Sequence, residues 1–525
     1  MKKPMKKNLG FRQSQAGLHT WTGLLVGWIL YLIFLNGTVS YWREEITRWS
    51  RPEIAATKDL ETVARGAIAH LAATAPKAAS WTITLPEERA SGATATWKAK
   101  GKPAFRRGTD PNAVTIGPDG KPVTVRDTEG GNAFYRLHFD LRYIPVLWGR
   151  WVVGFCTMFM LVAIVSGVIT HKKIFTDFFT FRPGKGQRSW LDAHNALAVL
   201  SLPFHAMITY TGLITLMVLY MPFAATANYP TLKAYYAATA LPKPPKASGE
   251  AAPLIDIGHV LRVAETTWDG GKPTVIRIDN PGDKAALITA YRRPSETLVD
   301  GRHEIVLDGV TGALRSVSEP SSSGMIARGG MVGLHAARFS PMTLRWLFFL
   351  SGVAGTAMVA TGLIMWTSKR RAKLEGRKHF GFWLVERLNI GTVAGLPLAM
   401  TGFLWANRLL PLNLPNRGDW EVHVMALTWL AMLLYAFVRP PRRAWIEQLS
   451  LTGLALVLLP IFDQAATGRG LIDSLKAGDG ALVGMELGLL GLGAAFLLIA
   501  WRVAKPKAPR KTERARSPQL AEVRG

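Results

Sequence analysis

Residues 191–212, LDAHNALAVLSLPFHAMITYTG, place His194 and His205 in a segment that has no Asp, Glu, Lys or Arg from Ala193 to Leu232. A polar imidazole inside a bilayer is expensive unless it has a partner, so each histidine is a candidate functional residue. In a straight helix, eleven residues make about three turns, which would place both imidazoles on nearly the same face, roughly 16 Å apart. Pro203 would kink this helix locally. The spacing suits two haem groups stacked across a membrane, each taking one axial ligand from this helix.

Long charge-free runs recur along the 525 residues, 49% of which are hydrophobic. Several reach about 20 residues, the length that a helix needs to cross the hydrocarbon core of a bilayer. They predict a mainly α-helical polytopic membrane protein with about eight transmembrane helices. The predicted spans are residues 13–42, 147–171, 191–221, 344–368, 388–408, 420–438, 444–463 and 481–502.

The formal net charge is +27, and its location decides between a nucleic-acid partner and a membrane. Basic residues gather in alternate connections: MKKPMKK, HKKIFTDFFTFRPGKGQR, SKRRAKLEGRK, RPPRR and the tail at 503–525. An excess of Lys and Arg marks the cytoplasmic side, so we expect both termini to be cytoplasmic. The charge indicates topology and contact with anionic membrane lipid, and we expect no nucleic-acid partner.

The only cysteine, Cys156, lies inside a predicted span, so a disulfide framework is excluded. The sequence also lacks a CxxCH motif for covalently attached haem and a cysteine-rich iron–sulfur site. It has no GxGxxG in a strand–helix context and no Walker motif. Electrons would therefore come from a separate donor, either a cytoplasmic flavoprotein or quinol.

The first part of the chain occurs twice. Placing His19 on His194 aligns the glycines of NGT and TGL, and LHFDLRYIPVLWGRW then matches LHAARFSPMTLRW with a two-residue gap. The aligned landmarks are Gly37 with Gly212, His138 with His335, Arg150 with Arg345, and Gly167 with Gly362. Each copy reads as span, extracytoplasmic insert, Leu-His, span, which indicates an internal duplication. His171 and His205 have no histidine counterpart in the other copy.

The two inserts, residues 43–146 and 222–343, each have the pattern of a small α+β domain. In the second insert PLIDIGHVLRVAETTW has helical periodicity, and PTVIRIDN, AALITAYR and HEIVLDGVTGALRSV alternate as strands do. The first insert has the same order, with DLETVARGAIAHLAATAP followed by SWTITLP, ATATWKAK and NAVTIGPDGKPVTVRD.

This doubled pattern of spans, inserts and Leu-His landmarks resembles the PepSY-associated transmembrane family of bacterial inner-membrane proteins. The resemblance covers about residues 10–370, and family members include haem-containing ferric-siderophore reductases. It implies a multi-pass protein of the bacterial inner membrane with two periplasmic PepSY-like inserts. It also implies a ferric siderophore as the substrate. Arg106, Arg107, Arg292 and Arg293 in the inserts are candidates for docking an anionic chelate.

With this topology the candidate haem ligands fall into two clusters. His19, His171 and His194 form an inner cluster, and His138, His205 and His335 form an outer one. We expect two non-covalent b-type haems with bis-histidine ligation, which leaves no open position on the iron and favours electron transfer. The pairing of ligands within each cluster stays open.

The preferred interpretation is a haem-b redox enzyme, a ferric-siderophore reductase that delivers electrons to a periplasmic ferric siderophore and releases Fe(II). One alternative is a siderophore or metal permease, although the spans carry few charged groups that would couple to ions. Asp192, Glu421 and Asp463 lie at the ends of predicted spans, whereas Glu486 lies further inside one. The other alternative is a PepSY-type regulatory or binding membrane protein without redox activity.

Overall fold

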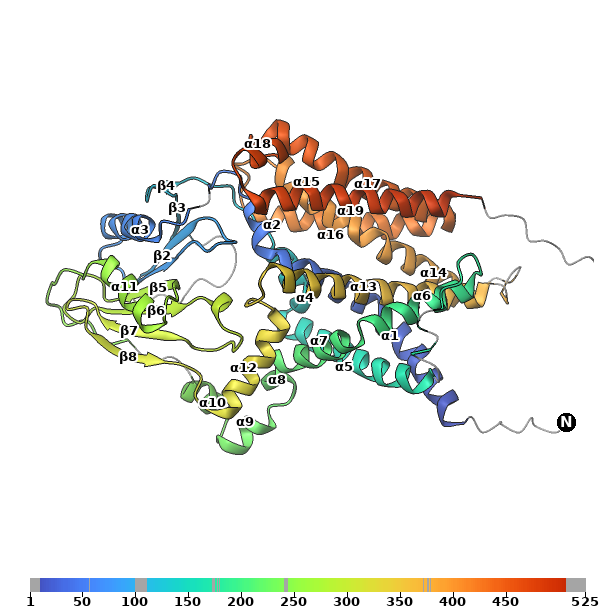
Figure 1. The fold of residues 1–525 in the computed structure, drawn as a ribbon, viewed down its shortest axis with the longest axis horizontal. Helices are drawn as coiled ribbons and strands as arrows, with labels where there is room; N and C mark the ends of the chain where they lie inside the picture. The colour runs from blue at the N-terminus through green and yellow to red at the C-terminus, as the bar shows by residue number, and fades with distance from the viewer. Residues whose placement is uncertain are drawn as a thin grey trace, which may run out of the picture.

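The computed structural model describes residues 10–506, apart from 56, 100–110, 172–174, 177, 179, 240–243, 372, 375–376 and 378. It consists of a layer of long helices with a β-sheet at one end (Figure 1). Helix α1 begins, and helix α19 ends, at the end of the helical layer opposite the sheet (Figure 1). Most of the predicted basic tail, residues 507–525, lies outside the described residues, as does the basic stretch before residue 10.

Seven helical segments of the described chain are long and apolar enough to cross a membrane. They are α1 continued through α2 (Phe11–Trp49), α5 (Val146–Thr170), α13 (Met342–Arg371), α14 with α15 (Phe380–Leu409), α16 (Arg417–Val438), α17 (Pro441–Ala466) and α19 (Gly480–Ala504). An eighth span is formed if the bent pair α6 (Gln187–Leu200) and α7 (Leu202–Thr215) crosses as one unit. The prediction of a mainly α-helical polytopic membrane protein is confirmed.

The segment between Gln187 and Thr215 is broken rather than straight. Helices α6 and α7 meet at Ser201 with a bend of 68°. Pro203 lies in the first turn of α7, where its missing N–H cannot extend the hydrogen bonds of α6. The expectation that His194 and His205 share one face of a straight helix is therefore wrong.

The two inserts join in one antiparallel sheet of eight strands, in the order β4-β3-β2-β1-β5-β6-β7-β8. Strand β1 (Ser80–Thr84) of the first insert pairs with β5 (Pro273–Asp279) of the second, with Thr82 opposite Arg277. The other strands are β2 (Ala93–Lys98), β3 (Ala113–Ile116), β4 (Pro122–Val123), β6 (Leu287–Arg292), β7 (Glu304–Asp308) and β8 (Leu314–Ser318). The pairing covers an edge that each insert would otherwise expose, so the inserts form one composite unit rather than two separate domains.

One helix from each insert covers the sheet. Helices α3 (Leu60–Thr74) and α11 (Ile257–Thr267) bury Val63, Leu71 and Val260 against strand residues such as Ile83 and Ile276. These five side chains are completely excluded from solvent. The helix-then-strands order predicted for each insert is thus present, with both copies contributing to a common core.

Two short helices connect the sheet to the helical layer. Helix α4 (Asn132–Asp140) precedes α5, and α12 (Ser323–Ala336) precedes α13. Both end at a non-glycine residue in the left-handed region, Leu141 with φ 47° and Ala337 with φ 50°. This shared turn directs each chain copy from its short helix into its long one. The remaining helices are α8 (Met217–Tyr220), α9 (Phe223–Asn228), α10 (Leu232–Thr239) and α18 (Leu471–Lys476).

Candidate functional site

Four of the six candidate histidines form two facing pairs. His19 on α1 faces His194 on α6, with ring centroids 6.2 Å apart. His138 on α4 faces His335 on α12, with ring centroids 6.1 Å apart. Each pair takes one residue from each copy of the repeat. We call the first the terminus-side pair and the second, which lies nearer the inserts, the sheet-side pair.

Every paired imidazole is held through Nδ1 by a backbone carbonyl of a neighbouring long helix. The four Nδ1–oxygen distances are 2.8 Å for His19 to Ala163, 2.9 Å for His194 to Met358, 2.7 Å for His138 to Ile33 and 3.1 Å for His335 to Ile208. A carbonyl oxygen only accepts, so each Nδ1 carries the hydrogen and donates it. In a neutral imidazole this leaves the lone pair of Nε2 free to bind a metal.

A glycine lies four residues after each of these carbonyls. If the glycine carried a Cβ atom, that atom would lie 2.7 Å from the His138 ring at Gly37 and 2.9 Å from the His335 ring at Gly212. The corresponding distances are 3.1 Å at Gly167 to His19 and 3.2 Å at Gly362 to His194. The missing side chain lets each imidazole reach the helix backbone. These four glycines are among the aligned landmarks of the sequence repeat. Their positions in the sequence therefore mark where the histidines contact the helix backbone.

The spacing within each pair suits a single metal ion between two imidazoles. A metal–imidazole bond is about 2 Å long and the ring centre lies about 1 Å beyond the nitrogen, so two rings on one ion have centres about 6 Å apart. The observed separations are 6.2 and 6.1 Å. Two axial imidazoles with free Nε2 atoms are the donor set of a bis-histidine haem. The ring planes are inclined by 69° in the terminus-side pair and 31° in the sheet-side pair, so the two sites are not identical.

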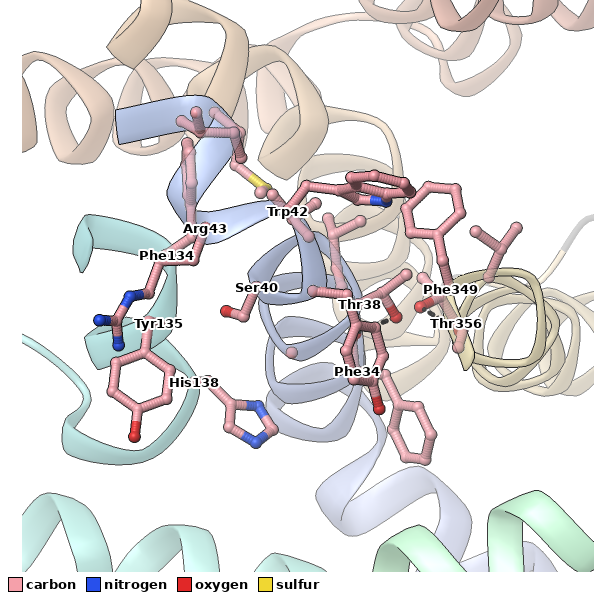
Figure 2. Close-up of a pocket in the computed structure, with 18 of the residues that line it drawn as sticks. Phe34, Thr38, Ser40, Trp42, Arg43, Phe134, Tyr135, His138, Phe349 and Thr356 are labelled. Carbon is pink, nitrogen blue, oxygen red and sulfur yellow. Dashed lines mark hydrogen bonds between the residues drawn. The ribbon is translucent and has the colours of Figure 1, made fainter. Parts of the chain in front are cut away.

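The sheet-side pair opens into a cavity of about 4060 Å³, lined by both of its histidines. Figure 2 shows the His138 imidazole beside α1, on the same side as Tyr135 and Arg43, whereas Phe349 and Thr356 lie on the other side of that helix. The Arg43 guanidinium lies over the Tyr135 ring, 4.9 Å from its centroid. Toward the sheet the cavity is lined by both arginines and carboxylates, among them Arg43 and Glu44, which form an ion pair at 3.0 Å.

Of the four arginines that were predicted to bind an anionic chelate, the two that the structure describes lie in different surroundings. Arg293 lines the cavity, whereas Arg292 forms an ion pair with Glu296 at 3.0 Å. Arg106 and Arg107 lie outside the described residues. Sequence reasoning missed Arg43 and Arg338, which also line the cavity.

His205 does not join the sheet-side pair as the three-membered outer cluster required. It is 1% exposed, and its ring packs edge-to-face against Phe34 with centroids 6.1 Å apart. Its Nε2 has no hydrogen-bond partner within the described part of the chain. The bend at Ser201 gives His205 a direction different from that of His194.

His171 also lies outside the facing pairs. Its Nε2 accepts a hydrogen bond of 2.8 Å from the side-chain amide of Asn195, the residue that follows His194. A ring nitrogen occupied in this way is not free for a metal. The structure therefore brings His171 to the neighbourhood of the terminus-side pair but does not seat it as the other four are seated.

The repeat-equivalent arginines secure the ends of the short histidine-bearing helices. Arg150 contacts Asp140, the last residue of α4, with Nε 2.9 Å from the carboxylate. Arg345 donates a 2.8 Å hydrogen bond to the carbonyl of Ser340, just after α12. Both arginines were landmarks of the sequence repeat, and the structure assigns them this supporting contact.

Helices α15 and α16 form a hydrogen-bond network with the segment that leads into α4. The buried Glu421 of α16 accepts hydrogen bonds from Thr128 at 2.6 Å and from Asn407 at 2.8 Å. Arg417 pairs with the same carboxylate at 2.6 Å and donates to the carbonyl of Asp127 at 3.1 Å. This network fixes the segment that precedes His138, and no sequence motif indicated it.

Comparison with known proteins agrees with this arrangement. A family model described as the PepSY-associated TM region matches residues 16–369. A Pseudomonas aeruginosa protein, named there as an uncharacterized protein, is 27% identical over 376 residues, which cover 69% of this chain and 92% of that protein. The family match includes both copies of the repeat and all four facing histidines. The chain therefore belongs to the PepSY-associated transmembrane family.

Proposed function

We propose that this protein is a haem-b redox protein of the bacterial inner membrane that carries electrons to a periplasmic ferric siderophore. The observation that carries the proposal is the pair of facing histidine seats, each with Nδ1 fixed by a carbonyl and Nε2 free. Reduction of the chelate adds one electron to Fe(III), and the resulting Fe(II) is a poorer match for hard oxygen ligands, so iron is released. The enzyme would be a ferric-siderophore reductase.

The chain's own residues would define two sites. His19 and His194 would hold one haem b, and His138 and His335 would hold the other. Haem b would supply a one-electron couple at its iron, and ligation by two imidazoles would leave no position for oxygen chemistry. The carbonyl contacts at Nδ1 keep each ring in the binding tautomer and increase the basicity of Nε2.

Direction follows from the two ends of the molecule. In the proposed topology both termini are cytoplasmic and the composite sheet is periplasmic, in keeping with the Lys and Arg excess at the terminus end. The sheet-side pair adjoins the cavity, and Arg293 and Arg338 in its lining are the residues that we propose to contact an anionic chelate there. A separate donor, a cytoplasmic flavoprotein or quinol, would supply electrons at the terminus-side pair.

The test uses the purified full-length protein. We expect a bis-histidine b-type absorption spectrum, two haems per chain and complete extraction of the haem into acidified acetone. After reduction with dithionite, addition of a ferric siderophore should reoxidise the protein, and a ferrous chelator should trap the iron. A haem-free protein that moves intact siderophore into vesicles would instead support the permease.

Adding a methyl group at Gly37 should disturb the sheet-side site selectively. In a Gly37→Ala variant the new Cβ would lie 2.7 Å from the His138 ring, so the ring must shift away from the Ile33 carbonyl. We expect a changed low-spin electron paramagnetic resonance signal for one haem and an unchanged signal for the other. Gly23→Ala is the matched control, because no atom lies within 4 Å of its added Cβ on the same helix. Identical spectra for both variants would contradict the role given to Gly37.

A further inference from the structure

The cavity beside the sheet-side pair continues as a groove between α13, which lies within the family match, and α19 near the end of the chain. On α13 the lining residues include Val353, Ala357, Ala360 and Ile364, which recur every three or four positions. On α19 they include Gly484, Gly488, Leu492 and Ile499, with the same periodicity. Each set follows one face of its helix, so the groove runs along the membrane-spanning direction.

The α19 face of this groove is left unpacked by the described residues. A Cβ built on Gly480, Gly484 or Gly488 would meet no atom within 4 Å. The groove floor is provided by α15, through Pro397, Met400 and other residues. Protein interiors are close-packed, so an open apolar channel of this kind inside a bilayer is filled by an apolar chain from its surroundings.

The charged residues along the groove indicate the chemistry of the molecule that fills it. At the end opposite the sheet the cavity is lined by Lys185, Arg371, Arg442, Arg502 and Lys505. The acidic residues that line the same cavity, among those described, all lie at the sheet end: Glu44, Glu45, Glu87, Glu88, Glu296, Asp300 and Asp479. Arg371 is paired with Glu386, and Lys185 lies in the loop before α6. Arg442, Arg502 and Lys505 form the positive cluster on the α17 and α19 side of the groove mouth.

This cluster is preorganised by contacts with its own helices. Arg442, at the start of α17, donates hydrogen bonds of 3.0 and 2.9 Å to the carbonyls of Ala504 and Lys505 at the end of α19. The ammonium group of Lys505 lies over the Trp501 ring, 3.5 Å from its centroid. The three cations are therefore held together where α17 and α19 meet, at headgroup depth for a lipid whose tail occupies the groove.

We propose that this groove is a binding site for an anionic phospholipid. One acyl chain lies along the glycine face of α19, and the phosphate is bound by Arg442, Arg502 and Lys505. A neutral quinol headgroup would gain little from three cations, and a partner helix would not require them at one end. The lipid would fill the space between the family-matched region and the C-terminal helices. The proposal does not depend on the redox function.

Native mass spectrometry of the full-length protein in mixed lipid nanodiscs tests this site. Phosphatidylglycerol should stay bound under activation that removes phosphatidylcholine with the same acyl chains. The double variant Arg502→Gln with Lys505→Gln should lower the preference for phosphatidylglycerol about tenfold or more, since each surface cation contributes to binding of anionic lipid. Lys272→Gln with Lys284→Gln, at exposed positions in the second insert, is the charge-matched control and should leave the preference unchanged.

Filling the groove provides an independent arm. Gly484→Leu with Gly488→Leu should reduce retention of both lipids, because leucine side chains would occupy the acyl channel. The proposal would be overturned if the native protein retained phosphatidylglycerol and phosphatidylcholine equally. It would also be overturned if the Arg502→Gln and Lys505→Gln variant kept the native preference for phosphatidylglycerol. A bound quinone or single-span protein that is released by the leucine variant, in place of phospholipid, would also overturn it. If the leucine variant does not fold, the Arg502→Gln and Lys505→Gln variant still tests whether the three cations bind the phosphate.

Discussion

Replacing His194 by alanine is expected to remove one of two haems, and replacing His335 by alanine is expected to remove the other. Each substitution deletes one of the two imidazoles that face each other across about 6 Å, and a single axial histidine holds a non-covalent haem poorly. Haem content measured by the pyridine haemochrome method should fall to about half in each variant. The inclination of the ring planes differs between the pairs, so two distinct low-spin signals should each vanish in one variant only.

The same two variants separate binding from electron delivery. Protein lacking the sheet-side ligand His335 should keep a reducible haem yet lose reoxidation by ferric siderophore, because the cavity adjoins that pair. His70→Ala on α3 is the control, since His70 lies in the sheet domain and outside both pairs. Retention of full haem content by both His194→Ala and His335→Ala would refute the ligand assignment.

Replacing Arg417 by methionine is expected to destabilise the fold severely. Both side chains of the Arg417–Glu421 pair are 0% exposed, so the substitution leaves a carboxylate buried without its cation. Breaking such a pair from one side typically costs about 3–5 kcal/mol. Thermal unfolding in detergent, followed by intrinsic fluorescence, should show a large fall in the midpoint together with loss of the sheet-side haem signal.

Two further variants identify the cause of that loss. Arg417→Met combined with Glu421→Gln removes the unpaired charge and should recover part of the stability. Arg65→Met breaks exposed contacts with Glu61 and Asp256, where side chains are 44–50% exposed, and should cost about 0–1 kcal/mol. Equal midpoints for Arg417→Met and Arg65→Met would show that the buried network does not support the fold.

The helical architecture and the equivalence of His19 with His194 and of His138 with His335 could be predicted from the sequence, whereas the pairing of ligands was left open. Span length and charge asymmetry are properties of single segments, which the chain displays directly. The repeat preserves both sides of each contact, a histidine on one helix and a glycine on another. His19 with His194 and His138 with His335 were therefore recognisable as equivalents before their positions in space were known. Their direct facing is the additional fact that the structure supplies.

Other features depend on contacts that one sequence does not display. Strand β1 pairs with β5 across the two inserts. The alternation of residues within a strand predicts which face is buried but not which strand lies beside it. The direction of His205 depends on the bend between α6 and α7, which Pro203 indicated only as a local kink. Arg417 and Glu421 bind the loop before α4, in contacts between residues almost 300 positions apart. No periodic pattern in the sequence indicates these contacts.

Because each facing pair draws one histidine from each copy of the repeat, the order of biosynthesis has a consequence for maturation. When the ribosome has made the first copy, only His19 and His138 exist, and neither has its partner. The terminus-side seat is completed by His194, whereas the sheet-side seat waits until His335 has emerged and the second insert has joined the first. If the pairs hold haem as proposed, loading at the sheet side would be a late event in biogenesis, and a nascent chain truncated before His335 would lack one of the two imidazoles of that site.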